Sequence, residues 1–202
     1  KNFFTYHFIN SLSKILSLLN RKLFIKLAKI VGSLINTFFP LRSGVAKKNL
    51  KIAFPQKSDN EINKIIKKTY QHYSIIIFEF IRQKFIKIKS IQVNIDDTTK
   101  KILSSNKGII LMTAHFGNWE AGLRYLQGNG LKISALYRPL NNPYVENIVK
   151  RVRKGPNIPK GRDGLREIVS QVKNGNYVII LADQKVTGGV PVKFFHEDAI
   201  HQ

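Results

Sequence analysis

The second half of the chain alternates short apolar runs with helical stretches, and this alternation restricts the fold more than any other feature of the sequence. The apolar runs predict strands at residues 107–114, 131–137, 177–182 and 190–195. Helical patterns lie between them, at residues 118–126, 142–154 and 165–173. Strands that alternate with helices predict an α/β fold, with a mostly parallel sheet flanked by helices. The site of such a fold lies at the carboxyl ends of its strands.

The first 44 residues instead predict an amphipathic helix. Between residues 13 and 38 an apolar stripe recurs at helical spacing, made of Leu23, Leu27, Ile30 and Leu34. The opposite side is basic, with Lys22, Lys26 and Lys29. This pattern suits a helix lying in the headgroup region of an anionic membrane, and a surface helix packed on its own core gives the same pattern. We divide the chain into a membrane-associating helical region, 1–44, and an α/β domain, 45–202.

The charge of the chain is strongly positive and uneven. The formal net charge is +22, and residues 1–90 hold 18 basic side chains against 3 acidic ones. A general bias toward lysine explains this, as does a polyanionic partner such as nucleic acid, acidic lipid or a phosphorylated substrate. The lysines are dispersed and no basic/aromatic module is recognised, which argues against nucleic acid.

Two classes of feature are excluded by composition or length. The chain has no cysteine, which excludes disulfides, a thiolate nucleophile and cysteine-based zinc sites. Its longest uncharged runs in the N-terminal region, residues 2–13 and 30–41, have 12 residues each, whereas a membrane span needs about 20. We therefore expect association with a membrane surface rather than a clean transmembrane helix.

A histidine follows the first predicted strand. The segment KGIILMTAHFGNWE places His115 just past the apolar run and Glu120 five residues later. An imidazole can take a proton from a hydroxyl near neutral pH, and a carboxylate on its other nitrogen would fix the tautomer. Gly117 would allow close approach of a substrate, and the N–H groups that open the next helix could support an oxyanion. The spacing alone is a weak motif.

Further polar residues lie near the same predicted edge. Arg138 and Asp183 each follow a strand, and Asp183 could hold an arginine or orient the site. Arg151 and Arg153 are candidates, like Arg138, for binding phosphate or the carbonyl oxyanion, because guanidinium groups suit such anions. Arg151 and Arg153 could instead belong to a solvated helix face. The sequence does not decide which of these two arginines is the better candidate. Asn118 is a candidate helix cap and substrate contact.

The segment TAHFGNWE, residues 113–120, resembles the HX4D/E signature of glycerolipid-type acyltransferases. More narrowly, it is similar to the late acyltransferases of lipid A biosynthesis, of the lauroyl or myristoyl type. Further blocks resemble that family in the same order: NLKIAFP, YRPLNNP, RVRKG, GRDGLREI, LADQ and VKFF. Together they cover residues 45–195.

The resemblance implies an O-acyltransferase that moves a fatty acyl chain from acyl carrier protein, or acyl-CoA, to a hydroxyl of a lipid A precursor. His115 would be the general base and Glu120 would orient it. No cofactor or metal is implied. The implied partners are acyl carrier protein, anionic membrane lipid and a phosphorylated glycolipid acceptor. The implied location is the cytoplasmic face of the cell inner membrane.

Two departures from the family pattern leave alternatives open. His196 stands where the family usually has glycine after the paired phenylalanines, and the family continues well beyond the position of Gln202. We therefore expect a domain that is incomplete at its C-terminus. The alternatives are an inactive membrane-binding remnant of the family, or another lysolipid or glycolipid acyltransferase.

Overall fold

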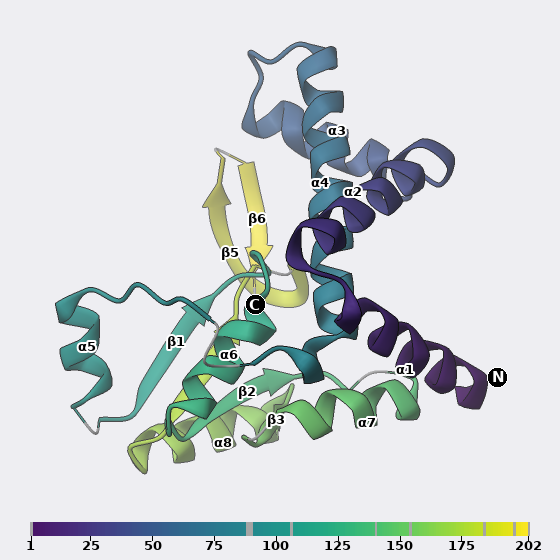
Figure 1. The fold of residues 1–202 in the computed structure, drawn as a ribbon. Helices are drawn as coiled ribbons and strands as arrows, with labels where there is room; N and C mark the ends of the chain where they lie inside the picture. Colours follow the sequence, from purple (N-terminus) through teal and green to yellow (C-terminus); the bar gives the residue numbers. More distant parts are fainter. Residues whose placement is uncertain are drawn as a thin grey trace. The chain divides into compact units, whose positions relative to one another are not determined.

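A computed structural model of the chain describes residues 2–87, 91–105, 107–139, 141–153, 155–183, 185–195 and 197–201. The chain divides into two compact units, one of residues 1–8, 83–190 and 201–202, the other of residues 9–82 and 191–200. The helices (Figure 1) are α1 (Asn2–Leu18), α2 (Arg21–Phe38), α3 (Ser43–Ala53), α4 (Asp59–Ile81), the 3-10 helix η1 (Gln83–Phe85), α5 (Asp97–Leu103), α6 (Trp119–Gly128), α7 (Pro143–Val152) and α8 (Arg162–Lys173). The strands are β1 (Ile109–Thr113), β2 (Ile133–Tyr137), β3 (Asn157–Pro159), β4 (Tyr177–Leu181), β5 (Lys185–Phe194) and β6 (Glu197–His201).

A four-stranded sheet forms the centre of the first unit. Its strand order is β1-β4-β2-β3, and each neighbouring pair is parallel. This confirms the α/β fold with a mostly parallel sheet. The strand expected at residues 190–195 corresponds to the second half of β5, which ends at Phe194 and pairs with β6 in a separate two-stranded sheet. The three-residue strand β3 was not expected, because its proline and short length are typical of a loop.

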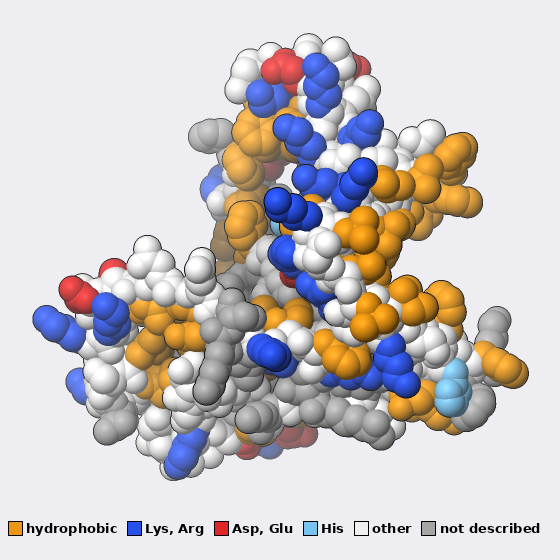
Figure 2. Space-filling view, in the orientation of Figure 1, with side chains coloured by type: hydrophobic (Ala, Val, Ile, Leu, Met, Phe, Trp, Pro, Cys, Tyr) orange, Lys and Arg blue, Asp and Glu red, His pale blue; other side chains and the backbone are white. Residues whose placement is uncertain are grey.

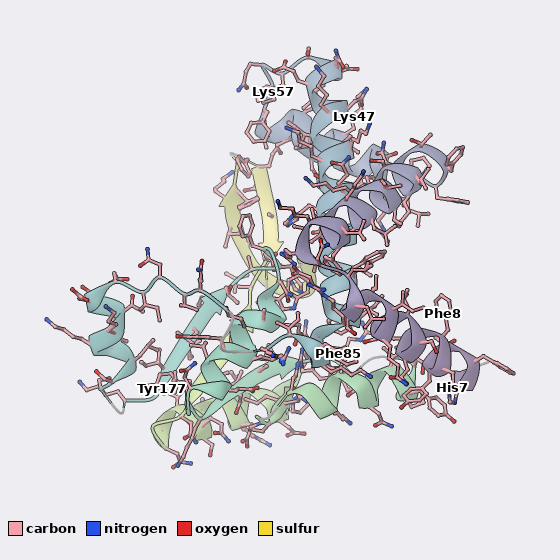
Figure 3. All side chains as sticks on the ribbon, in the orientation of Figure 1. His7, Phe8, Lys47, Lys57, Phe85 and Tyr177 are labelled. Atoms are coloured by element: carbon pink, nitrogen blue, oxygen red, sulfur yellow. The ribbon has the colours of Figure 1, made fainter. Side chains whose placement is uncertain are left out.

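The two faces of the parallel sheet bury different helices, because side chains alternate along each strand. On one face, Ile133 and Ile179 pack with Leu123 of α6. Tyr177, labelled in Figure 3, belongs to the same cluster, and its hydroxyl donates to the Leu103 carbonyl oxygen at 2.6 Å. On the other face, Val178 packs with Ile168 of α8. Both faces of the sheet therefore pack against helices.

Residues 91–99 differ from expectation. We expected partial strand there, but residues 91–95 form no regular element and α5 begins at Asp97. The Asp96 side chain caps this helix by accepting a hydrogen bond from the Thr99 N–H at 2.9 Å. An Asp followed by helix-compatible residues is a start signal, and it outweighs the β-branched residues before it.

The second unit contains α2, α3 and α4. The single helix expected over residues 13–38 is broken at Asn20, which caps α2 by accepting from the Leu23 N–H at 2.9 Å. The capping box expected at Ser58 and Glu61 is confirmed at the start of α4. Gly32 lets α2 approach α4 closely, because a Cβ there would lie 2.6 Å from the backbone of Gln71.

The apolar stripe of α2 that contains Leu23 and Leu34 has a neighbouring stripe, formed by Phe24, Ala28, Val31 and Ile35, and the two stripes have different surroundings. Phe24 and Ala28 are fully buried, whereas Leu23 and Leu34 are 49% and 50% exposed. Packing on the protein therefore explains one stripe and not the other. No single described helix is long and apolar enough to cross a membrane, and α2 with α3 meets that test only as a pair bent by 99°.

Candidate functional site

Two neighbouring strands bring His115 and Asp183 together. Strands β1 and β4 are paired in register, with Thr113 opposite Leu181. The pairing continues one residue further, since the Ala182 N–H donates to the Thr113 carbonyl oxygen at 2.9 Å. His115 and Asp183 each follow two residues after their strand, so the register places them side by side at the carboxyl edge of the sheet.

The Asp183 carboxylate contacts both the backbone and the ring of His115. Its Oδ2 accepts from the His115 backbone N–H at 2.8 Å, and its Oδ1 lies 2.7 Å from Nδ1 of the ring. A neutral ring that donates from Nδ1 has its basic lone pair on Nε2. The side chains are 28% and 38% exposed, so the pair is held in place yet accessible from solvent.

The pKa of Asp183 lies below its ordinary value. Burial alone would raise it, but the hydrogen bonds from the His115 ring and backbone N–H, with the attraction to the ring, outweigh burial and lower it. The carboxylate is therefore ionised at neutral pH and can stabilise a positive charge on the imidazole.

The turn between β1 and α6 shapes the other side of the histidine. Gly117 has φ +60°, a left-handed conformation that favours glycine. A Cβ there would meet nothing within 4 Å, so backbone conformation rather than space explains the glycine. Asn118 caps α6 by accepting from the Ala121 N–H at 3.1 Å, as expected. The Trp119 ring meets the His115 ring edge-on, with centroids 4.8 Å apart.

Glu120 does not occupy the place expected for it beside the imidazole. It is 5% exposed, and both of its carboxylate oxygens accept from the Arg153 guanidinium, with Nε to Oε2 at 3.0 Å. The carboxylate expected to orient the His115 ring was Glu120, and the carboxylate that contacts the ring is that of Asp183. The reason is topological: β4 lies next to β1, whereas Glu120 sits in the first turn of α6 and meets the residue that ends α7.

A tyrosine and a second glutamate support this buried ion pair, and the sequence analysis missed both. The Arg153 guanidinium lies over the Tyr137 ring, 4.4 Å from its centroid, and also donates to Asn157 Oδ1 at 3.0 Å. The Tyr137 hydroxyl donates to the buried carboxylate of Glu146 in α7. Burial and then the hydrogen bond to Glu146 raise the pKa of Tyr137 well above its ordinary value. The alternation of side chains along the strand puts Tyr137 on the same face as Ala135, and this pattern could have indicated that Tyr137 is partly buried.

The remaining candidates are placed as follows. Arg138 follows β2 at the carboxyl edge and is exposed. Arg151 lies in α7, but its side chain is outside the described part of the structure. Among the described residues, no group of three His, Asp or Glu side chains is arranged to hold a metal ion.

Comparison with known proteins gives consistent similarities. A family model described as "Bacterial lipid A biosynthesis acyltransferase" matches residues 2–202. The lipid A biosynthesis palmitoleoyltransferase of Escherichia coli K12 is 30% identical over 159 residues, which cover 76% of this chain and 52% of that protein. A lipid A biosynthesis acyltransferase of Shigella flexneri matches with the same figures. The lauroyltransferase of Escherichia coli K12 is 24% identical over 156 residues, covering 73% of this chain and 50% of that protein. The chain thus spans about half the length of these curated relatives.

Proposed function

Because the chain belongs to the bacterial lipid A biosynthesis acyltransferase family, we propose that it transfers a fatty acyl chain from a thioester donor to a hydroxyl of a lipid A precursor. The donor is the acyl thioester of acyl carrier protein or of coenzyme A. The observation that carries the proposal is the His115 ring, accessible from solvent and oriented through Nδ1 by Asp183.

His115 acts as the general base. Its Nε2 takes the proton of the acceptor hydroxyl as the oxygen attacks the thioester carbonyl, and a tetrahedral oxyanion forms. Collapse of that intermediate breaks the carbon–sulfur bond and forms the ester, and the imidazolium returns the proton to the leaving thiolate. No acyl-enzyme is needed. General-base assistance of this kind contributes roughly 10²–10⁴ in rate.

Two carboxylates have different tasks in this mechanism. Asp183 fixes the tautomer and stabilises the imidazolium, as the third member of a hydrolase triad does. Glu120, bound to Arg153, holds the first turn of α6 against the rest of the unit. That turn carries the backbone N–H groups that we assign to the oxyanion.

Exposed apolar side chains that are close to the histidine in sequence suit a fatty acyl substrate. Phe116 follows His115 directly and is 89% exposed, and Met112 on β1 is 64% exposed. We assign these side chains to contacts with the acyl chain, because burying apolar surface against them favours binding.

The helices of the second unit provide a surface for an anionic membrane. Leu23, Leu27, Ile30 and Leu34 of α2 remain exposed. Figure 2 shows basic side chains gathered beside hydrophobic ones over α2, α3 and α4. Two of the lysines are labelled in Figure 3: Lys47 lies within α3, and Lys57 lies in the connection between α3 and α4. A basic surface with an apolar stripe binds anionic lipid, and we assign the chain to the cytoplasmic face of the inner membrane.

The test is mass spectrometry of lipid A precursor incubated with the chain and acyl carrier protein charged with a labelled acyl group. Wild-type protein should add one acyl mass in ester linkage, and His115→Ala should abolish the product. His72→Ala is the matched control, because His72 is an exposed histidine on α4. Transfer by His115→Ala at the wild-type rate, or none by the wild-type chain, would overturn the proposal; the second result would favour a membrane-binding remnant.

A further inference from the structure

The side chains of β1 that point away from α6 are left uncovered. Side chains alternate along a strand, and Ile109 and Leu111 pack against the cluster that contains Leu123 of α6. Ile110 and Met112 therefore point to the opposite face, which is the face that packs against α8. They are 45% and 64% exposed. A parallel sheet normally has both faces covered, so this side of β1 is an open apolar face.

Helix α8 covers the neighbouring strand and leaves β1 open. Val178 of β4 lies opposite Ile110 in the register, and it is fully buried and packed with Ile168 of α8. Leu165 and Val169, also on α8, are exposed. These two residues are four positions apart, so they lie on the same side of the helix.

Two close backbone contacts show that this exposed pair of α8 is on the side of the helix nearest β1. A Cβ at Gly164 would lie 1.7 Å from the carbonyl oxygen of Pro159 in β3. A Cβ at Gly108, just before β1, would lie 1.8 Å from the carbonyl oxygen of Val172. Successive residues of a helix are rotated by about 100°, so the direction that leads round α8 from Gly164 to Val172 leads on to the exposed pair. That direction runs from β3 toward β1.

Four side chains thus form one apolar surface with a closed end and an open end. We call it the β1–α8 surface, and its members are Ile110, Met112, Leu165 and Val169. The contact of Gly108 with Val172 closes it at the amino edge of the sheet, four residues and about 13 Å from Met112. Its other end opens at the carboxyl edge, where Met112 comes three residues before His115, which is at most about 11 Å of extended chain.

The size and chemistry of the β1–α8 surface suit a hydrocarbon chain better than a protein. Strand β1, with the sequence IILMT, has no charged side chain. Four partly exposed apolar side chains form a patch of about 300–600 Å², whereas a stable protein partner buries about 800 Å² on each side. The open end of the surface also lies beside the histidine to which the proposed function assigns acyl transfer.

We propose that the β1–α8 surface binds the distal part of the transferred acyl chain and limits its length. This rests on the proposed function and adds the residues that select among fatty acyl donors. The chain extends from the thioester at His115 past Met112 toward Gly108, where the contact with Val172 stops it. Each methylene buried along this path tightens binding about fourfold, and methylenes beyond the stop add nothing.

The first test locates the acyl chain by NMR in His115→Ala, where no transfer consumes the probe. The probe is an acyl pantetheine thioester, because pantetheine is the arm common to acyl carrier protein and coenzyme A. It carries a nitroxide either near the thioester or near the methyl end of the chain. The first label should broaden the methyl signal of Met112 most, and the second that of Ile110. Absent broadening, or equal broadening of both methyl signals by both labels, would overturn the proposal.

The second test compares the affinities of acyl pantetheines of increasing chain length. Ile110→Trp and Val169→Trp fill the β1–α8 surface, so the longest chains should bind about tenfold or more weakly, the loss of two buried methylenes. The shortest chains should bind as they do to the wild type. Ile102→Trp is the matched control, because Ile102 is an exposed isoleucine on α5 and its neighbour Leu103 packs on the opposite face of the sheet.

The remaining outcomes also decide the proposal. Affinity that does not depend on chain length would overturn it, as would an equal loss of affinity in Ile102→Trp. A dimer in sedimentation that Leu165→Asp converts to a monomer would assign the β1–α8 surface to a second copy of the chain, and would overturn it as well. Because only binding is measured, failure here leaves the proposed function standing, and failure of transfer leaves the binding result readable.

Discussion

Replacing Glu120 by glutamine tests whether this carboxylate supports the fold, in contrast to the Asp183 carboxylate, which we assign to the chemistry. The side chains of Glu120 and Arg153 are 6% and 9% exposed. Removing one partner of a buried pair costs about 3–5 kcal/mol, because the other charge is left buried without compensation. Glu120→Gln and Arg153→Met should each destabilise the protein by about that amount. The double variant should lose clearly less than the sum, because neither member of the Glu120–Arg153 pair is then left without the other.

Asp183→Asn provides the contrast. Its pair with His115 is 28% and 38% exposed, and solvent-exposed pairs contribute only about 0.2–1 kcal/mol. This variant should therefore unfold near the wild-type denaturant concentration and yet transfer acyl groups slowly. Neutral replacement of Glu120 should thus be seen mainly in stability, whereas neutral replacement of Asp183 should be seen mainly in the rate of transfer.

Urea unfolding followed by the fluorescence of Trp119, the only tryptophan, measures these free energies next to the site. A coupling energy between Glu120 and Arg153 below about 0.5 kcal/mol, the limit of ordinary additivity, would refute the argument. So would an Asp183→Asn variant that loses as much stability as Glu120→Gln.

The following predictions rest on particular contacts. Because the pKa of Tyr137 is raised, its protonated phenol stabilises the fold, and that stability is lost as pH rises from about 10 through the folded pKa. At pH values where fluorescence shows the protein to be folded, absorbance at 295 nm should show as many tyrosines titrating near pH 10 in the wild type as in Tyr137→Phe, which has one tyrosine fewer. Because the pKa of Asp183 is lowered, its carboxylate stabilises the fold above about pH 4, and this stability is lost as pH falls through the folded pKa. The urea midpoint of Asp183→Asn should therefore fall less than that of the wild type over this pH range. Leu34→Asp, at the exposed stripe of α2, should weaken flotation with anionic vesicles about tenfold or more, the loss of one buried leucine, and unchanged flotation would count against the stripe as a membrane contact.

The order of elements was predictable because local signals set it. The apolar runs gave β1, β2 and β4 to within two residues, and Asn142 before Pro143 gave the start of α7. Strand order is not local. The sequence shows that His115 and Asp183 both follow strands, but only the pairing of β1 with β4 shows that the two meet.

The prediction that Glu120 is the partner of the histidine was wrong for the same reason, because strand order is not a local property. Glu120 is close to His115 along the chain, and local spacing favoured it over Asp183, which is 68 residues away. The pairing of Glu120 with Arg153 depends on where α7 ends relative to α6, which no motif encodes. The roles assigned to these residues, and the boundary drawn at residue 44, remain predictions.

The rate of acyl transfer by Asp183→Asn tests the central claim most directly, measured beside wild type under single-turnover conditions and at a temperature where both are folded. The pair of His115 with Asp183 predicts a fall of about 10² or more, because the imidazole loses its orientation and the counter-charge for its protonated form. A variant that transfers the acyl chain as fast as wild type would contradict the assignment of the proton transfer to this pair.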